Sequence, residues 1–295
     1  MSGVRRVAAG DLEVGYQESG PADGPPVILL HGFPYDARGC DDAAAILARE
    51  GRRVIVPWLR GYGPTRFRDP ETMRSGQQAA LAADLLALMD ALAIPSAVLA
   101  GCDWGGRAAC IVAALHPERC RGLVSCGSGY NVLDIAAAAH PVAPEQEHRH
   151  WYQHYFRTDR GREGLRRHRA ELCRLLWRLW SPTWGFDDGA YSRSAAAFDN
   201  PDFVEVVVHS YRHRFGGVPG DPRYEDTERR LALRPAIPVP TVVLHGADDG
   251  VDPCGPVFRD APRFSGPVER RVLPGVGHNP PQEAPEAFAA AVLSL

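Results

Sequence analysis

The segment Gly101-Cys102-Asp103-Trp104-Gly105-Gly106 decides the fold, because it joins an apolar run to a stretch with helical character. Residues 97–100 before it predict a buried strand, and residues 107–115 after it predict a helix. Its small residues let the backbone turn sharply and stay close to its neighbours. In the comparable pattern G-x-S-x-G the residue at the tip is a nucleophilic serine, but here it is Asp103 and the chain has no G-x-S-x-G.

A carboxylate at this position changes the chemistry that we expect. Carboxylate nucleophiles attack carbon by displacement and form an alkyl ester. The substrate of Asp103 should therefore carry a carbon–halogen or carbon–oxygen bond that can be opened.

Apolar runs alternate with helical patterns through much of the chain. Strands are predicted at residues 27–30, 53–56, 97–100, 122–125, 240–244 and 268–273. Helices are predicted at residues 43–50, 77–92, 107–115 and 284–293. Strands that alternate with helices indicate an α/β fold, with a mostly parallel sheet flanked by helices on both faces.

The alternation stops between residues 129 and 230. This segment is rich in Arg, His, Trp and Tyr, and its best helical pattern covers residues 164–180. We therefore predict an α/β core made of residues 1–128 and 231–295, with residues 129–230 inserted as a helical cap.

Composition excludes several classes of function. The hydrophobic content of 45% and the net charge of −3 are ordinary for a globular protein and give no case for nucleic acid or membrane partners. The chain contains no lysine, which excludes Schiff-base chemistry. No apolar run reaches the length of a signal peptide core or of a membrane span. The seven cysteines form no Cys-x-x-Cys pair, so we expect reduced thiols, no metal site and a cytoplasmic location.

Two later loops carry the groups that would complete a catalytic triad, in the chain order nucleophile, acid, histidine. Asp248 and Asp249 follow the predicted strand at 240–244, and His278 follows the strand at 268–273. A histidine can activate water to hydrolyse the ester on Asp103, and a second carboxylate orients the imidazole. Spacing alone does not choose between Asp248 and Asp249, and Asp252 is a weaker third candidate.

The oxyanion of the second step needs hydrogen-bond donors. His31-Gly32-Phe33-Pro34 directly follows the strand at 27–30, so the backbone amide of Phe33 can point at the site. The amide of Trp104, the residue after the nucleophile, would be the second donor.

Taken in order, these motifs resemble the epoxide hydrolase branch of the α/β-hydrolase superfamily, which is related to haloalkane and haloacetate dehalogenases. Residues 31–34 resemble its H-G-x-P motif, residues 103–105 its D-W-G elbow and residues 60–65 its R-G-Y-G-x-S loop. The resemblance covers nearly the whole chain, implies the α/β-hydrolase fold and favours Asp249 as the acid. The chain departs from the pattern at Cys102, where relatives often have His or Gln, and at Trp58, where they usually have Asp.

The resemblance also implies two tyrosines in the cap that protonate the oxygen of an opened epoxide. Residues 151–156 resemble the first cap motif and select Tyr152, and residues 210–213 resemble the second and select Tyr211. A phenol with an ordinary pKa near 10 is protonated at neutral pH and can donate. The chain is thus expected to be an epoxide hydrolase that converts a small apolar epoxide to a vicinal diol without a metal or cofactor.

Two alternatives stay open. The same triad serves in haloalkane and haloacetate dehalogenases, although haloacetate dehalogenases carry an arginine after the nucleophile, where this chain has Trp104 and keeps Arg107 at a matching position. The other alternative is an inert α/β-hydrolase fold that only binds a ligand. A homodimer is compatible with either.

Overall fold

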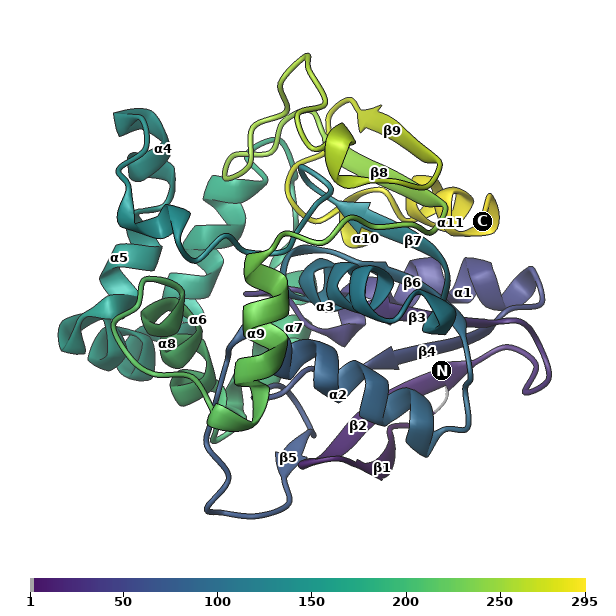
Figure 1. The fold of residues 1–295 in the computed structure, drawn as a ribbon, viewed down its shortest axis with the longest axis horizontal. Coiled ribbons are helices and arrows are strands. Elements are labelled where there is room, and N and C mark those ends of the chain that lie inside the picture. The colour runs from purple at the N-terminus through teal and green to yellow at the C-terminus, as the bar shows by residue number, and fades with distance from the viewer. Residues whose placement is uncertain (1–2) are drawn as a thin grey trace.

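The structure, a computed structural model, describes residues 3–295 and is built around one mostly parallel sheet (Figure 1). The strand order is β1-β2-β4-β3-β6-β7-β8-β9, with β5 paired to β2. Neighbours from β4 to β9 in this order are parallel, whereas β2 pairs antiparallel with β1, β4 and β5. The strands are β1 Arg5–Ala9, β2 Leu12–Ser19, β3 Pro26–Leu30, β4 Arg53–Pro57, β5 Arg66–Phe67, β6 Ala97–Gly101, β7 Cys120–Cys126, β8 Thr241–Gly246 and β9 Val268–Leu273.

The predicted strands are confirmed as β3, β4, β6, β7, β8 and β9. β3, β4, β6, β7 and β8 are almost entirely buried, as expected for strands covered on both faces. The sequence did not predict β1, β2 or β5. β1 is largely exposed and β5 has only two residues, so neither carries a continuous apolar run.

The core helices pack in two groups on the faces of the sheet (Figure 1). α2 packs on α3, whereas α1 packs on α10 and α11. These helices are α1 Asp41–Arg49, α2 Gln78–Ala91, α3 Asp103–Leu115, α10 Pro280–Glu283 and α11 Pro285–Leu293. The predicted closing helix at residues 284–293 is α11, and Ala284 (φ −143°, ψ 62°) separates it from the short α10, because the residue before a proline is kept out of the helical region.

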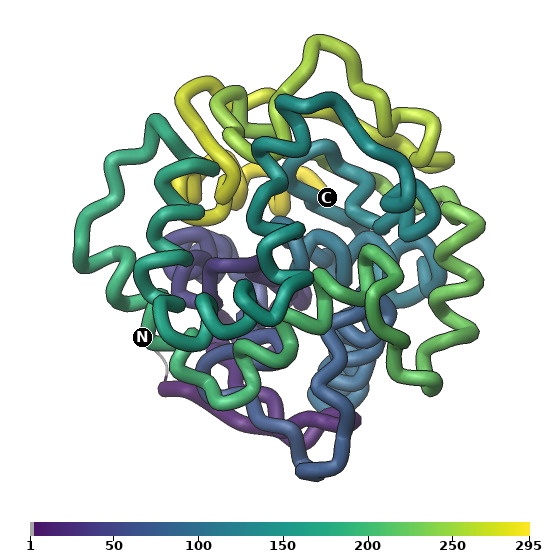
Figure 2. The backbone as a smooth tube through the Cα atoms, turned by 90° about the vertical axis from the view of Figure 1, so that its left-hand side faces the viewer, coloured from purple at the N-terminus to yellow at the C-terminus, as the bar shows by residue number. Residues whose placement is uncertain are grey.

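The chain between β7 and β8 is helical. It contains α4 Pro144–Arg149, α5 Trp151–Arg157, α6 Asp159–Trp180, α7 Asp188–Ala195, α8 Phe203–Arg214 and α9 Glu225–Ala232. α6 begins earlier than predicted because the Thr158 hydroxyl accepts a hydrogen bond from the amide of Gly161 and caps it (2.9 Å). Figure 2 shows these teal and green segments in front of the sheet.

The division of the chain into a core and a cap over residues 129–230 remains a proposal. α4, α5, α6 and α8 stand together to one side of the sheet in Figure 1. α9, which crosses residue 230, packs instead against α2 of the core.

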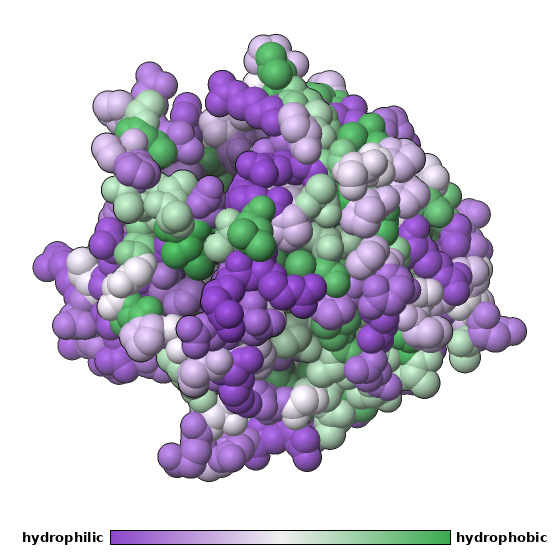
Figure 3. Space-filling view, in the orientation of Figure 1, coloured by the Kyte–Doolittle hydropathy of each residue, from purple (hydrophilic) through white to green (hydrophobic). Residues whose placement is uncertain are grey.

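The surface of the described chain is mixed. Figure 3 shows hydrophilic residues over most of one face, with hydrophobic residues in small groups between them. Every helix within residues 3–295 is too short or too polar to cross a lipid bilayer.

The sheet gathers the candidate residues at one of its edges. β3, β6, β8 and β9 run parallel, and the loops with Phe33, Asp103, Asp249 and His278 each follow the carboxyl end of one of them. Ligand sites of open α/β sheets form at this edge, because the loops converge there. The order of the strands therefore brings together residues that are far apart in the sequence.

Candidate active site

Asp103 occupies a sharp turn between β6 and α3. Its φ is +49°, a left-handed conformation that is unfavourable for a residue other than glycine. Cys102 before it is extended, and α3 begins at Asp103 itself. A Cβ on Gly105 would lie 2.3 Å from the carbonyl oxygen of Leu30, so only glycine allows the helix to approach β3 this closely. The tight packing around the turn holds the strained conformation of Asp103.

The backbone after β3 faces the carboxylate of Asp103. The amide of Phe33 donates a hydrogen bond to Asp103 Oδ1 at 2.9 Å. A Cβ on Gly32 would lie 2.5 Å from the Cβ of Asp103, so this approach also requires glycine. The amide of Trp104 belongs to the first turn of α3, where amides have no acceptor within the helix. Of the two predicted donors, the Phe33 amide contacts the carboxylate, and the Trp104 amide directly follows Asp103 in the chain.

The structure brings Asp249 to His278. Nδ1 of His278 lies 2.7 Å from Oδ2 of Asp249. The other oxygen, Oδ1, accepts hydrogen bonds from the amides of Val251 (2.9 Å) and Asp252 (2.8 Å). Both side chains are buried, with 1% of Asp249 and 9% of His278 exposed. Every oxygen of this carboxylate therefore has a partner, and its position is fixed.

The two other candidate acids point elsewhere. Asp248 is partly exposed, and its side chain makes no hydrogen bond or ion pair within residues 3–295. Asp252 accepts a hydrogen bond from the amide of Ser128 at 2.7 Å, which ties it to the loop after β7. Of the three carboxylates that the sequence offered, the loop geometry brings only Asp249 to the imidazole.

Charges on both sides act on the imidazole of His278. Burial alone would lower its pKa, but the carboxylate of Asp249, both through its charge and through its hydrogen bond, holds the pKa well above the ordinary 6.5. The charge of Asp103 acts in the same direction. His278 is thus prepared to carry a positive charge beside the side chains of Asp249 and Asp103.

A residue of the cap segment holds the loop of His278. Ser181, just after α6, accepts a hydrogen bond from the amide of His278 through its hydroxyl oxygen (3.1 Å) and donates one to Glu283 (2.6 Å). Glu283 in turn accepts from the amides of Gly277 (2.7 Å) and Asn279 (2.8 Å). Ser181 and Glu283 were not predicted from the sequence, because a single serine and a single glutamate carry no motif.

The two predicted tyrosines meet above the nucleophile turn. Tyr152 on α5 and Tyr211 on α8 are 4% and 1% exposed, and their ring centroids lie 5.6 Å apart. The Phe33 ring stacks on Tyr152 and meets Tyr211 edge-on. Burial raises the pKa of Tyr152 to about 12 and that of Tyr211 well above 10, and the charge of Asp103 raises both further. Both phenols are therefore protonated at neutral pH.

An aromatic wall closes the space around these groups. Trp180 at the end of α6 contacts the ring of His278 edge-on at 5.1 Å and the ring of Tyr152 at 5.0 Å. Phe156 and Phe203 pack on Phe33 from the cap side. Such a lining excludes water and strengthens the electrostatic interactions inside it.

The two departures from the sequence pattern have structural explanations. The thiol of Cys102 donates to the carbonyl oxygen of His278 at 3.0 Å and so links the nucleophile turn to the histidine loop. The indole nitrogen of Trp58 donates to Asp36 Oδ2 at 3.1 Å. Asp36 is fully buried, and burial raises its pKa to about 6. Trp58 thus partners a buried acid that lies elsewhere in the chain.

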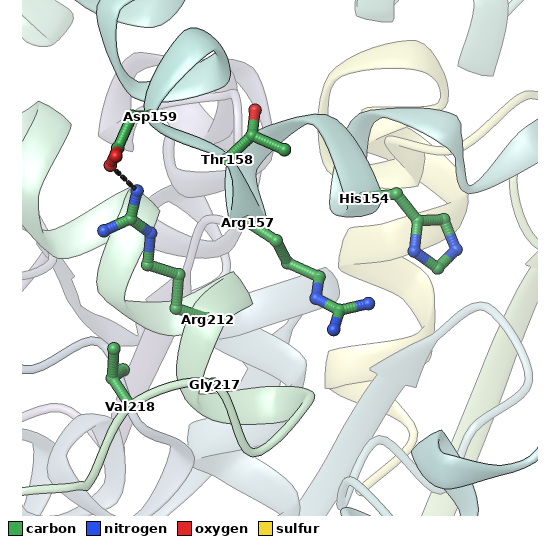
Figure 4. A pocket seen from close by; sticks show the side chains of 7 residues that line it. All are labelled: His154, Arg157, Thr158, Asp159, Arg212, Gly217 and Val218. Atoms are coloured by element: carbon green, nitrogen blue, oxygen red, sulfur yellow. Dashed lines mark hydrogen bonds and ion pairs between the residues drawn. The ribbon is translucent and has the colours of Figure 1, made fainter.

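A cavity of about 510 Å³ lies on the cap, but none of its residues is a predicted catalytic residue. Figure 4 shows charged side chains around it, with Arg212 bonded to Asp159. It is lined by His154, Arg157, Thr158, Asp159, Arg212, Gly217 and Val218. Within residues 3–295 no cluster of His, Cys, Asp and Glu could hold a metal ion.

Comparisons with known proteins show the family to which this fold belongs. The family described as alpha/beta hydrolase fold matches residues 25–285. A crystal structure of "a putative epoxide hydrolase" from Klebsiella pneumoniae is 47% identical, with a TM-score of 0.96 over 99% of this chain and 96% of that one.

Among curated proteins, epoxide hydrolase B of Mycobacterium tuberculosis is 32% identical over 150 residues, which are 47% of this chain and 41% of that protein. The chain therefore spans less than half the length of this relative. A 2-hydroxy-6-oxo-6-(2'-aminophenyl)hexa-2,4-dienoic acid hydrolase of Metapseudomonas resinovorans is 30% identical over 99% of this chain and 90% of its own length.

Proposed function

Because the chain belongs to the alpha/beta hydrolase fold family, we propose that it is an epoxide hydrolase whose nucleophile is Asp103. One observation carries the proposal: an aspartate occupies the nucleophile turn, and two buried, protonated phenols meet beside it. The names of the relatives from Klebsiella pneumoniae and Mycobacterium tuberculosis support it.

In the first step a carboxylate oxygen of Asp103 attacks an epoxide carbon. A carbon–oxygen bond forms to Asp103 while the carbon–oxygen bond of the strained ring breaks. The departing oxygen takes a proton from Tyr152 or Tyr211, which becomes a phenolate for the lifetime of the intermediate. The product is a hydroxyalkyl ester on Asp103.

In the second step His278 removes a proton from water, and the resulting hydroxide attacks the ester carbonyl of Asp103. The amides of Phe33 and Trp104 stabilise the oxyanion. His278 returns its proton to the departing alkoxide, so that a vicinal diol leaves. The hydrolysed side chain of Asp103 is then a neutral carboxyl group, and its proton passes to the phenolate of Tyr152 or Tyr211. Epoxide and water are consumed and the enzyme returns to its starting state.

The charge of Asp103 couples the two steps. Its carboxylate helps to hold the pKa of His278 high in the free enzyme. Alkylation neutralises that carboxylate, which lowers the pKa of His278 and so keeps the imidazole neutral for its role as the base in the second step.

Dehalogenation by the same triad is the second candidate. The indole nitrogen of Trp104 is buried and has no hydrogen-bond partner within residues 3–295. An N–H group of this kind suits a departing halide, which accepts hydrogen bonds. Release of halide from haloalkanes or fluoroacetate, without opening of epoxides, would favour this candidate.

A single turnover in ¹⁸O-labelled water tests the covalent route. With enzyme in excess, the first diol should take its new oxygen from Asp103 and contain no solvent label. Solvent label in the first diol would overturn the mechanism.

Substitution of the proposed base gives a second readout. The variant His278→Gln should accumulate the alkyl ester, visible as added mass on the peptide that contains Asp103. His154→Gln, a change of the same type on the cap surface, should accumulate none. Ligand binding without turnover of any epoxide or halide would instead indicate an inert binding protein.

A further inference from the structure

The two phenols beside Asp103 differ in their hydrogen bonds. The hydroxyl oxygen of Tyr152 accepts a hydrogen bond from Nε2 of Gln153 at 3.1 Å. The hydroxyl of Tyr211 makes no hydrogen bond within residues 3–295. A tyrosine hydroxyl has one proton to donate, and its oxygen can accept a hydrogen bond at the same time. Gln153 therefore occupies the oxygen of Tyr152 and leaves its proton free to donate.

A second contact fixes the orientation of the Gln153 amide. Its oxygen Oε1 accepts a hydrogen bond from Nη1 of Arg214 at 3.0 Å. A guanidinium can only donate, so the amide oxygen must face Arg214 and the NH₂ group must face Tyr152. The reverse orientation would place two donors against each other. Gln153 is 6% exposed, and burial of an amide is costly unless it is hydrogen-bonded, so both contacts stabilise this one arrangement.

These contacts join two helices. Tyr152 and Gln153 are neighbours on α5, and neighbouring residues of a helix do not face each other. Arg214 is the last residue of α8, which packs on α5. Its guanidinium carbon also lies 5.0 Å from the ring centroid of Tyr211. Arg214 thus contacts one phenol through its ring, whereas it reaches the hydroxyl of the other through Gln153.

The charge of Arg214 is not cancelled by a carboxylate. Within residues 3–295 its guanidinium forms no ion pair. By contrast Arg212, two residues earlier on α8, pairs with Asp159 at 2.8 Å on the rim of the cap cavity (Figure 4). A neighbouring carboxylate would oppose the field of the guanidinium. The positive charge of Arg214 therefore acts on the phenols.

The pKa values of the two phenols respond differently to this charge. Burial raises the pKa of Tyr152 to about 12, and the charge of Arg214 is the largest influence that opposes this rise. Burial also raises the pKa of Tyr211, followed by the side chains of Tyr152 and Asp103, and the opposing charge of Arg214 comes only after them. Arg214 is thus the main group that favours the phenolate of Tyr152.

We propose that Tyr152 is the phenol that protonates the epoxide oxygen, and that Gln153 and Arg214 are positioning residues that direct its proton and stabilise its phenolate. The proposal rests on the proposed function and deepens it. Tyr211 then donates a hydrogen bond to the same oxygen and keeps its own proton.

The proton transfer moves one negative charge from Asp103 toward Arg214. As Asp103 attacks, the ring carbon–oxygen bond breaks and the departing oxygen takes the hydroxyl proton of Tyr152. The electron pair of the broken O–H bond stays on Tyr152, and the ester on Asp103 is neutral. Nε2 of Gln153 already donates to the phenol oxygen, and this hydrogen bond becomes stronger when the oxygen is charged. The donor is in place before the charge develops, so no group has to reorient during the step.

The kinetic test is a double-mutant cycle on ester formation, followed by rapid-quench mass spectrometry. Gln153→Leu removes the donor to Tyr152 and should slow ester formation about 10- to 100-fold, with ester hydrolysis within about threefold of wild type. In Tyr152→Phe the same substitution should change the rate by less than about threefold, because no hydroxyl is left to position. In Tyr211→Phe it should keep its full effect. Equal effects in the two backgrounds would overturn the proposal.

The variant Gln153→Glu separates orientation from packing. Glutamate has nearly the same shape and still accepts from Arg214, but it offers only acceptors to Tyr152. The hydroxyl of Tyr152 would then donate to this carboxylate, which turns its proton away from the substrate. Ester formation should be at least as slow as in Gln153→Leu, and a wild-type rate would contradict the proposal. Arg212→Gln, the matched control for Arg214→Gln, should leave the rate unchanged.

A titration without substrate separates this proposal from the proposed function. With 3,5-difluorotyrosine in place of Tyr152 the phenol is more acidic, so its phenolate absorbance can be followed in the folded protein. Gln153→Leu should raise the pKa of this phenol by about 1 to 2, because it removes a hydrogen bond to the charged form. Arg214→Gln should raise this pKa more than Arg214→Lys, which keeps the charge, and Arg212→Gln should not change it.

These shifts would support the positioning role even if no epoxide is opened. A pKa that is the same with Gln153 and with Gln153→Leu would overturn the positioning role and leave the epoxide hydrolase proposal standing.

Discussion

Replacing Asp249 with asparagine tests the proposed triad sharply, because Asp248 beside it offers a control with the same substitution. Only Asp249 is bonded to His278, at 2.7 Å between buried atoms, whereas Asp248 makes no such contact. The variants Asp249→Asn and Asp248→Asn make the same change of charge at neighbouring positions, and only Asp249→Asn alters the group that faces His278.

The size of the effect follows from how Asp249 is held. Its Oδ1 accepts two backbone amides, so the oxygen of an asparagine would take that position and its NH₂ group would face Nδ1 of His278. The proton of the imidazole would then move to Nε2, the nitrogen that must accept the proton of water. Breaking a buried ion pair costs about 3–5 kcal/mol, which corresponds to a loss of roughly 10² to 10⁴ in the rate of ester hydrolysis.

The assay measures the two half-reactions separately. Rapid-quench mass spectrometry follows formation and decay of the ester on Asp103 after mixing with an epoxide. In Asp249→Asn the ester should form at close to the wild-type rate and then persist, whereas Asp248→Asn should stay within about threefold of wild type in both phases. Equal losses in the two variants, or equal slowing of both half-reactions in Asp249→Asn, would refute the assignment of the acid.

Three further expectations follow from other contacts. The double variant Tyr152→Phe/Tyr211→Phe should slow ester formation by roughly 10² to 10⁴ in stopped-flow measurements, and a wild-type rate would show that the phenols do not donate. Ser181→Ala leaves the buried amide of His278 without a partner and removes one of the two donors to Glu283 Oε1, so it should lower the free energy of unfolding in urea by about 1–3 kcal/mol, with a change near zero arguing against the serine link. Burial raises the pKa of Asp36 from 3.8 to about 6, so the folded protein disfavours its charged form, and this penalty is absent at low pH, grows between pH 4 and 6 and is complete above pH 6. Relative to Asp36→Asn, the wild-type protein should therefore lose about 2 kcal/mol of stability between pH 4 and pH 7, and a difference independent of pH would contradict this account.

Local patterns were enough to predict most of the sheet. The buried strands β3, β4, β6, β7 and β8 need apolar side chains on both faces, and such runs stand out in any sequence. The α/β-hydrolase fold predicted from them and from the motifs is confirmed. β1 and β5 were not predicted, because β1 is mostly exposed and β5 has only two residues. Both are strands because they pair with β2, not because of their amino-acid composition.

The identity of the proposed nucleophile is likewise a property of local sequence. Asp103 lies at the tip of a turn that contains three glycines and joins a strand to a helix. This local pattern is readable without knowledge of the segments that pack around the turn. The order of Asp103, the acid pair and His278 along the chain was also readable, because each follows a predicted strand. The strands, the turn and the order of these residues are each features of a single segment, and the side chains and backbone preferences of a few neighbouring residues determine them.

Contacts between segments were not readable in this way. Asp248 and Asp249 differ in no sequence property that would make one of them the partner of His278, and hydrogen bonds to the backbone of the β8 loop decide it. Arg107 is one of the 33 basic residues of the chain, and only the tertiary structure leaves it buried without a carboxylate partner within residues 3–295. The sequence by itself determined the sheet and the carboxylate at its turn, because these depend on neighbours in the chain. The tertiary structure alone decided which charges find partners and which stay unpaired, because pairing depends on distances that form only when the chain folds.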